Sequence, residues 1–254
     1  MKTPGVKECI YCASNGPFST VQHIIPESFL NIELTIRDAV CDGCQKYFGT
    51  KVEEFVLSKT LFALPRYQFW QRNKKGKLPV IDMSVPRKST GKFPSSSLSH
   101  DNIRFKNNED GSREIRLTDT TPNKRHHRES DTISIITTPM ALRTMGQFCL
   151  KVGLEVMALD FPEEVRDPRL DKARWYARYG VPHGTYWPLY VQNVAGPYVE
   201  PHMKFHLGPF ENGERWCDFD VVLFKFRFDL LNSAPKEVPD YIMLRPAPDS
   251  DRTQ

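Results

Sequence analysis

The stretch that decides the fold runs from Cys9-Ile-Tyr-Cys12 through Gln22-His-Ile-Ile-Pro26 to Cys41-Asp-Gly-Cys44. Both cysteine pairs have the Cys-x2-Cys spacing, and 28 residues separate them. A loop of this length lets two sulfurs face one ion, so two loops supply the four thiolates of a tetrahedral zinc site. Four protein ligands leave no open position, so we expect the zinc ion to be structural. Its expected ligands are Cys9, Cys12, Cys41 and Cys44.

The segment framed by the cysteines predicts two strands followed by a helix. Residues 19–25 are rich in strand-forming side chains and precede a proline, and residues 35–40 offer a second short strand. From Asp42 onward, apolar side chains recur every three to four residues, which is typical of one helix face. We expect this helix to reach about Phe62, with Pro65 as its stop.

A histidine at the end of a strand, followed by a turn, a second strand and a helix, resembles the HNH endonucleases of the ββα-metal type. The similarity is to the subgroup of that family in which four cysteines brace the module with zinc. It covers about residues 8–58, and a weaker similarity extends to residues 151–158. The segments that carry it are Cys9-Ile-Tyr-Cys12, Gln22-His-Ile-Ile-Pro-Glu-Ser-Phe-Leu-Asn31 and Val40-Cys-Asp-Gly-Cys-Gln-Lys-Tyr-Phe-Gly49.

The resemblance implies a metal-dependent endonuclease that hydrolyses phosphodiester bonds in DNA, with RNA not excluded. His23 would be the general base that takes a proton from the attacking water, which suits an imidazole near neutral pH. One Mg²⁺ or Mn²⁺ ion would sit on the scissile phosphate. The family holds that ion with the residue before the histidine and the residue after the last cysteine, which here are Gln22 and Gln45. Restriction or anti-phage defence is the context that such proteins suggest.

The sequence departs from the family at both metal-holding positions. Gln22 stands where the family has an acidic residue, and Gln45 stands where it has asparagine. Hard divalent cations prefer at least one carboxylate, which Asp38 is one candidate to supply. Two alternatives therefore stay open beside the endonuclease. One is a catalytically degenerate HNH fold that binds nucleic acid, and the other is a zinc-stabilised module for protein interaction.

The charge of the chain is concentrated in its middle. The 254 residues carry 35 basic and 31 acidic side chains, a net charge of +4. Residues 61–130 alone carry 15 basic and 7 acidic side chains, whereas the segments on either side have a slight acidic excess. Such a segment predicts contacts with phosphates that orient a nucleic acid without reading its bases. The residues expected to make these contacts are Lys74, Lys75, Lys77, Lys124, Arg125 and Arg128.

The whole chain predicts an α+β protein in two parts. An HNH-like module would occupy residues 1–66, and a larger mixed α+β region would occupy residues 67–254, with a basic segment at 67–130 and a helix-plus-sheet part at 131–254 that binds or senses substrate. Cys149 and Cys217 stand alone in apolar patterns, so we expect them in the core. Strands are expected at 78–83, 103–106, 114–118, 132–137, 189–192, 203–207 and 216–228, and helices at 139–157 and 168–179.

Composition indicates a cytoplasmic protein that does not enter membranes. Aromatic residues make up 11% of the chain, which excludes global disorder. No apolar stretch reaches the roughly 20 residues of a membrane helix, and the N-terminus lacks the apolar segment of a signal peptide. In an intracellular chain, paired cysteines favour zinc over disulfides. The sequence does not decide between a monomer and a homodimer.

Overall fold

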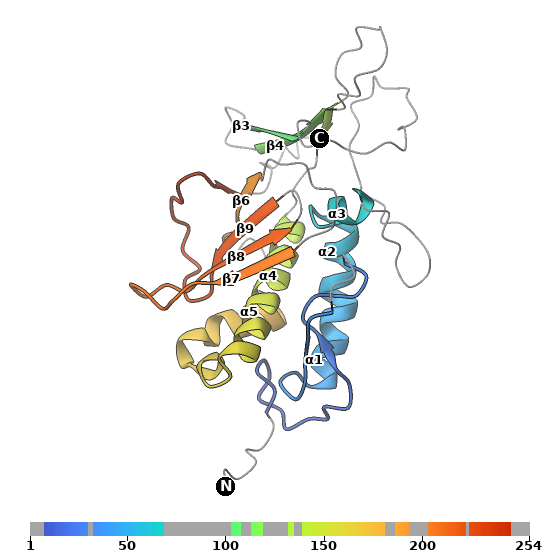
Figure 1. Cartoon of the computed structure of the whole chain (residues 1–254), viewed down its shortest axis with the longest axis vertical. Coiled ribbons are helices and arrows are strands. Elements are labelled where there is room, and N and C mark those ends of the chain that lie inside the picture. The colour runs from blue at the N-terminus through green and yellow to red at the C-terminus, as the bar shows by residue number, and fades with distance from the viewer. Residues whose placement is uncertain are drawn as a thin grey trace, which may run out of the picture.

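In this α+β protein, a long central helix separates an antiparallel sheet from the mainly helical segment of residues 8–68, which we call the N-terminal arm (Figure 1). The computed structural model describes residues 8–29, 33–68, 103–107, 113–118, 132–134, 139–180, 186–193, 203–221 and 224–244. The expected mixed α and β class is confirmed. No helix in this described part is long and apolar enough to cross a membrane.

The N-terminal arm has the expected order of strand, strand and helix. Strand β1 (Gln22–His23) pairs antiparallel with β2 (Thr35–Ile36), and the Ile24 N–H extends the pairing by donating to the Leu34 carbonyl at 2.8 Å. Both strands are shorter than expected, since the chain turns immediately after Ile25 at a proline that cannot donate to a ladder. Three consecutive helical segments follow, namely α1 (Asp42–Tyr47), η1 (Phe48–Glu53) and α2 (Glu54–Lys59).

The helix that begins at Asp42 ends at Lys59, so the prediction that Pro65 stops it is wrong. Thr60 has an extended backbone, and its hydroxyl donates to the Val56 carbonyl at 2.7 Å. A new helix, α3 (Ala63–Gln68), starts after this break. Pro65 lies in the first turn of α3, where a missing N–H leaves no hydrogen bond unmade.

The central helix α4 (Pro139–Asp160) is buried over most of its circumference, as its apolar sequence predicts. Two short 3₁₀ turns, η3 (Glu164–Arg166) and η4 (Pro168–Leu170), lead from it into α5 (Asp171–Tyr179). Gly180 ends α5 at a φ of +66°, a conformation that glycine adopts without strain.

The sheet beside α4 has five antiparallel strands in the order β10-β6-β9-β8-β7. The prediction of one long strand over 216–228 is wrong, because Val221 pairs with Phe224 and the run folds back as a hairpin. Apolar residues of both strands of this hairpin still face the core, including Phe224, Phe226 and Phe228. The strands are β6 (Tyr190–Asn193), β7 (Met203–Leu207), β8 (Trp216–Val221), β9 (Phe224–Asp229) and β10 (Ile242–Met243).

A second sheet of three antiparallel strands lies in the basic middle of the chain. Its strands are β3 (Ile103–Asn107), β4 (Arg113–Thr118) and β5 (Thr132–Ser134), in that order. They fall where strands are expected; β5 covers the start of the strand expected at 132–137, whose remaining residues lie outside the described part of the chain. The strand expected at 78–83 lies outside the described residues.

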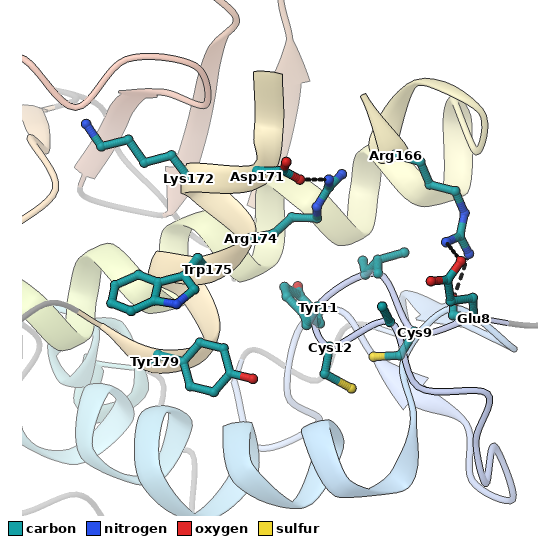
Figure 2. A pocket seen from close by; sticks show the side chains of 12 residues that line it. Glu8, Cys9, Tyr11, Cys12, Arg166, Asp171, Lys172, Arg174, Trp175 and Tyr179 are labelled. Atoms are coloured by element: carbon teal, nitrogen blue, oxygen red, sulfur yellow. Dashed lines mark hydrogen bonds and ion pairs between the residues drawn. The ribbon is translucent and has the colours of Figure 1, made fainter. Parts of the chain in front are cut away.

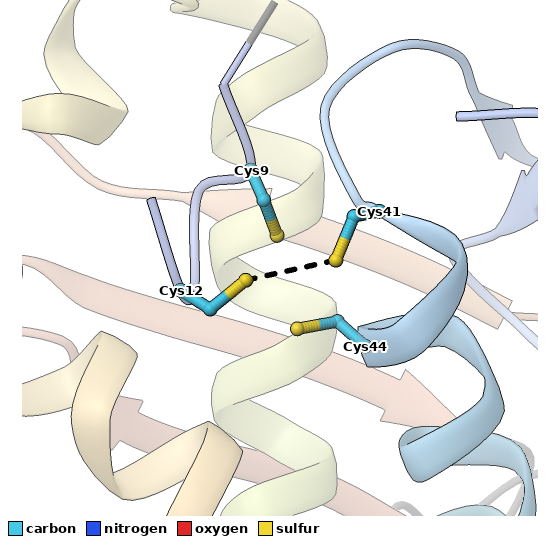
Figure 3. Close-up of side chains that lie close together, drawn as sticks. All are labelled: Cys9, Cys12, Cys41 and Cys44. Atoms are coloured by element: carbon cyan, nitrogen blue, oxygen red, sulfur yellow. Dashed lines mark hydrogen bonds between the residues drawn. The ribbon is translucent and has the colours of Figure 1, made fainter. Parts of the chain in front are cut away.

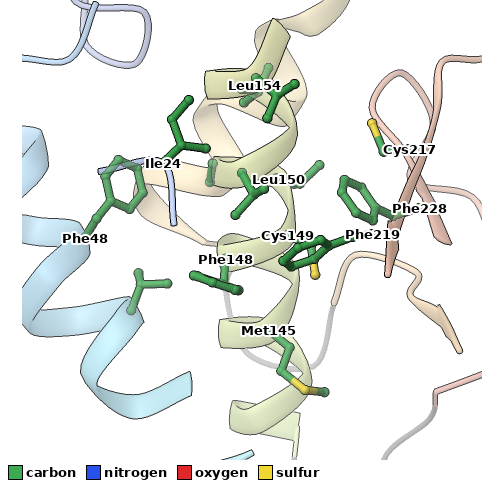
Figure 4. Packing of buried hydrophobic residues seen from close by; sticks show 14 of the residues in the cluster. Ile24, Phe48, Met145, Phe148, Cys149, Leu150, Leu154, Cys217, Phe219 and Phe228 are labelled. Atoms are coloured by element: carbon green, nitrogen blue, oxygen red, sulfur yellow. The ribbon is translucent and has the colours of Figure 1, made fainter. Parts of the chain in front are cut away.

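One continuous hydrophobic core joins the N-terminal arm, α4 and the sheet (Figure 4). Phe62 connects them, because its ring stacks on Phe226 at 4.5 Å and meets Phe148 of α4 edge-on at 5.1 Å. Gly153 lets α4 approach the sheet closely, since an added Cβ would lie 3.1 Å from Phe228 and Leu230. Cys149 and Cys217 are buried here, as expected. The segments on either side of the predicted domain boundary at residue 66 therefore share a core.

Replacing Phe62 by alanine tests this shared core. We expect Phe62→Ala to lower the free energy of unfolding by about 3–5 kcal/mol, because a fully buried ring is lost at the junction of three elements. Chemical denaturation followed by circular dichroism measures the change. Met140→Ala is the control, since Met140 is 61% exposed and should change stability by no more than about 0.5 kcal/mol. Equal effects of the two substitutions would contradict the packing described.

Candidate metal centre and the residues around it

The four predicted zinc ligands meet at one point between the loop of residues 9–12 and the start of α1 (Figure 3). Their sulfurs all lie within 4.8 Å of one another, and the Cys12 and Cys41 sulfurs are 3.6 Å apart. Zinc–sulfur bonds of about 2.3 Å in a tetrahedron place the sulfurs about 3.8 Å apart, so the cluster fits a zinc ion. It is the only group of three or more metal-ligating side chains found in the described part of the chain.

Hydrogen bonds within the cluster favour a thiolate at Cys9. The pKa of Cys9 is lowered to about 4, first by a hydrogen bond with the Cys44 thiol and then by backbone N–H groups, in spite of burial. The same hydrogen bond with Cys9, together with burial, raises the pKa of Cys44, and the Arg178 side chain opposes this shift by hydrogen-bonding to Cys44. Arg178 lies over the Tyr47 ring at 3.9 Å, which fixes the cation beside the cluster. A tetrathiolate zinc site carries net negative charge, so a neighbouring cation stabilises it.

His23 lies at the end of β1 with its side chain about one third exposed. Its Nε2 is 3.2 Å from a carboxylate oxygen of Glu27, and its backbone carbonyl accepts a hydrogen bond from Lys151 at 2.9 Å. The Nδ1 atom is buried and has no hydrogen-bond partner among the described residues. Lys151 thus fixes the backbone of His23 through its carbonyl, and the Nε2 atom of the partly exposed ring lies beside the Glu27 carboxylate.

Gln22 lies on the opposite side of the strand and does not join His23. Its side chain is buried, and its Nε2 donates to both carboxylate oxygens of Glu155, at 3.3 and 3.2 Å. Neighbouring residues of a strand point to opposite faces, so a surface-facing His23 places Gln22 in the core. The amide of Gln22 is therefore engaged with a core carboxylate.

Gln45 lies on the surface, where its side chain hydrogen-bonds to Thr20 and Val40; we call this set of contacts the Gln45 clasp. Its Oε1 accepts from the Thr20 hydroxyl at 2.8 Å, and its Nε2 donates to the carbonyls of Val40 at 2.9 Å and Thr20 at 3.2 Å. Asp42 strengthens the same contact, because its carboxylate accepts from the Thr20 hydroxyl at 3.0 Å and from the Ser19 N–H at 3.0 Å. These bonds attach the start of α1 to the chain that leads into β1.

The structure describes Asp38, Gln22 and Gln45 but none of the six predicted phosphate contacts. Asp38 is exposed after β2 and has a positive φ of 62°. Gln22 and Gln45 have separate protein partners, so these residues do not fit a divalent cation that needs carboxylate ligands. The six predicted phosphate contacts lie outside the described residues: Lys74, Lys75, Lys77, Lys124, Arg125 and Arg128.

A buried polar network behind His23 was not expected. Lys151 of α4 is fully buried, and its Nζ lies 2.8 Å from the Ile24 carbonyl, 2.9 Å from Glu53 and 3.1 Å from Glu155. Tyr11, within the first Cys-x2-Cys loop, donates to Glu155 at 3.2 Å. The sequence signal for this network is a lysine and a glutamate four residues apart in an otherwise apolar helix, since such residues share one helix face.

Burial changes the proton affinity of this network. Burial raises the pKa of Glu155 from 4.5 to about 7, although Lys151 and Gln22 oppose the change. Burial alone would lower the pKa of Lys151, but the carboxylates of Glu155 and Glu53 raise it above its ordinary value. The lysine therefore stays charged, while the glutamate titrates near neutral pH.

Comparison of the chain with protein-family models, with curated proteins and with solved structures found no match. The resemblance to HNH endonucleases thus depends on the residues and spacings of the N-terminal arm. Of the features that carry this resemblance, the four-cysteine metal site is the one that the geometry supports.

Zinc content and stability should change together. We expect about one zinc ion per chain by elemental mass spectrometry, and we expect Cys41→Ser to lose it and to unfold at lower temperature. Cys149→Ala is the control, because Cys149 is a buried thiol outside the cluster. A full zinc complement in Cys41→Ser, or its loss in Cys149→Ala, would refute the assignment.

Glu155 should give the fold a distinct pH dependence. Its pKa is raised in the folded chain, so between about pH 5 and 7 the folded state holds a proton that the unfolded state has released. The free energy of unfolding therefore falls as pH rises through this window, by up to about 1.4 kcal/mol per pH unit. Denaturation at a series of pH values should show this slope in the wild type and in the exposed control Glu163→Gln, and not in Glu155→Gln.

Proposed function

We propose that the protein binds nucleic acid through a zinc-braced ββα module that resembles HNH endonucleases but does not cleave. We infer the absence of cleavage from the contacts that the two glutamine side chains make with other residues of the protein. Gln22 is bound to Glu155 in the core, and Gln45 is bound to Thr20 and Val40 at the start of α1. Neither side chain brings the charge that a magnesium site requires.

Binding is supported by the charge of the chain and by the frame around the histidine. Residues 61–130 carry 15 basic and 7 acidic side chains, which suits contacts with a phosphate backbone. The zinc cluster and the Gln45 clasp stiffen the short strands, so the surface around His23 is presented on a fixed support. Phosphate contacts of this kind position a nucleic acid and supply most of its non-specific affinity.

One observation favours the metal-dependent DNA endonuclease as a second candidate. His23 is partly exposed at the end of β1, and its Nε2 lies 3.2 Å from Glu27. A carboxylate beside an imidazole fixes the orientation of the ring. The family's Mg²⁺ or Mn²⁺ ion remains without fitting ligands at Gln22 and Gln45.

Parallel binding and cleavage assays separate the two candidates. We expect the purified protein to retard labelled DNA in a gel with strong salt dependence, and to leave supercoiled plasmid intact with Mg²⁺ or Mn²⁺. His23→Ala should bind DNA as the wild type does, because non-specific affinity depends on phosphate contacts. RNA of the same length is assayed beside DNA.

Three outcomes would change the proposal. Metal-dependent nicking that is lost in His23→Ala would establish the endonuclease instead. Nicking that survives in His23→Ala would point to a contaminating nuclease or to another base, which a second purification step distinguishes. A protein that neither binds nor cuts nucleic acid would be assigned to the remaining alternative, a zinc-stabilised module for protein interaction.

A further inference from the structure

A pocket outside the His23 region lies between the first Cys-x2-Cys loop and α5 (Figure 2). Its volume is about 760 Å³, which falls within the range of small-ligand sites. The loop residues Tyr11, Cys12 and Ala13 form one wall, and residues of α5 form the other. The zinc cluster thus fixes one wall of the pocket through Cys12.

Two large aromatic side chains of α5 line this pocket and remain open to solvent. Trp175 and Tyr179 are each 49% exposed, and they lie one helical turn apart. Their ring centroids are 5.8 Å apart, and the rings are tilted by 44°. The Arg178 guanidinium lies 5.0 Å from the centre of the Tyr179 ring, which restrains that ring. Exposure of two such rings side by side is unusual on a helix whose opposite face is buried.

The segment that carries the aromatic pair is basic, but three of its arginines are paired with carboxylates: Arg166, Arg169 and Arg174. Residues 166–178 carry five basic and two acidic side chains. Arg174 is held by the Val165 carbonyl and by Asp171, and it keeps only 14% of its side chain exposed. Arg166 at the far end pairs with Glu8 at 3.1 Å. Lys172 is exposed at the rim and hydrogen-bonds to the Ser233 hydroxyl, a neutral group that does not cancel the ammonium charge.

We infer that this pocket binds an unpaired base of a single-stranded nucleic acid, with Trp175 and Tyr179 as the stacking surface and Lys172 near the phosphate. The inference rests on the proposed nucleic-acid-binding function and names the strand form that it recognises. Aromatic faces bind bases of any sequence by stacking, provided that the base is not paired. Basic side chains beside the rings follow the backbone, as in other single-strand sites.

Fluorescence anisotropy with labelled oligonucleotides tests the inference. We expect an oligothymidylate of about 16 nucleotides, and the matching oligouridylate, to bind more tightly than a duplex of the same length. Trp175→Ala and Tyr179→Ala should each weaken single-strand binding about tenfold, since stacking contributes on the order of 1–3 kcal/mol per base. Trp175→Phe should keep most of the affinity. Lys172→Gln should reduce the dependence on salt.

Phe161→Ala is the matched control, because Phe161 is an aromatic residue that is 41% exposed and does not line the pocket. Wild-type binding to single strands that persists unchanged in Trp175→Ala and Tyr179→Ala would overturn the inference and leave the proposed function intact. No binding to any nucleic acid would overturn both. A dimer in sedimentation that Trp175→Ala dissociates would assign the aromatic pair to self-association instead. Circular dichroism confirms that each variant is folded.

Discussion

The buried ammonium group of Lys151 is the interaction on which the arrangement depends. It contacts the carbonyls of His23 and Ile24, and it pairs with Glu53 and Glu155. These partners come from β1, η1 and α4, so one side chain fixes the strand, the arm helix and the central helix together. A buried charge destabilises the folded state unless all its hydrogen bonds are made. Lys151 meets that condition, because two carbonyls and two carboxylates surround its ammonium group.

The zinc cluster and this network act on the same short strands. Tyr11 lies inside the first Cys-x2-Cys loop and hydrogen-bonds to Glu155 and to the Lys151 carbonyl, so the metal loop is tied directly to α4. Strands of two residues contribute few ladder bonds of their own. Their order therefore depends on the four-cysteine cluster on one side and on the buried ion pairs on the other. This explains why the arm shares a core with the sheet and does not stand apart as an independent module.

Local patterns in the sequence were sufficient for the zinc ligands, the strand-strand-helix order, α4 and the inward-facing phenylalanines of β9. They failed at a change of phase within one apolar run, and where the deciding contact joins residues that are distant in the sequence. The inward-facing residues are odd-numbered in β8 and even-numbered in β9, so the alternation changes phase within the apolar run 221–224, and the prediction of a single strand overlooked this break. The contact between Gln22 and Glu155 joins residues 133 positions apart, and no local rule reveals it. Trp175 and Tyr179 fall within the helix expected at 168–179, but their exposure depends on how α5 packs.

The glutamine at position 22 follows from the same network. An acidic residue there would place a further carboxylate against Glu155, with Glu53 also near and only Lys151 to neutralise them. Like charges that share a buried site destabilise one another, whereas a neutral amide donates to the existing carboxylate. A glutamine at position 22 thus suits this core better than an acidic residue would. An acidic metal ligand at position 22 would need a residue other than Glu155 opposite it on α4. The packing of β1 against α4 therefore limits which metal ligands this strand can carry.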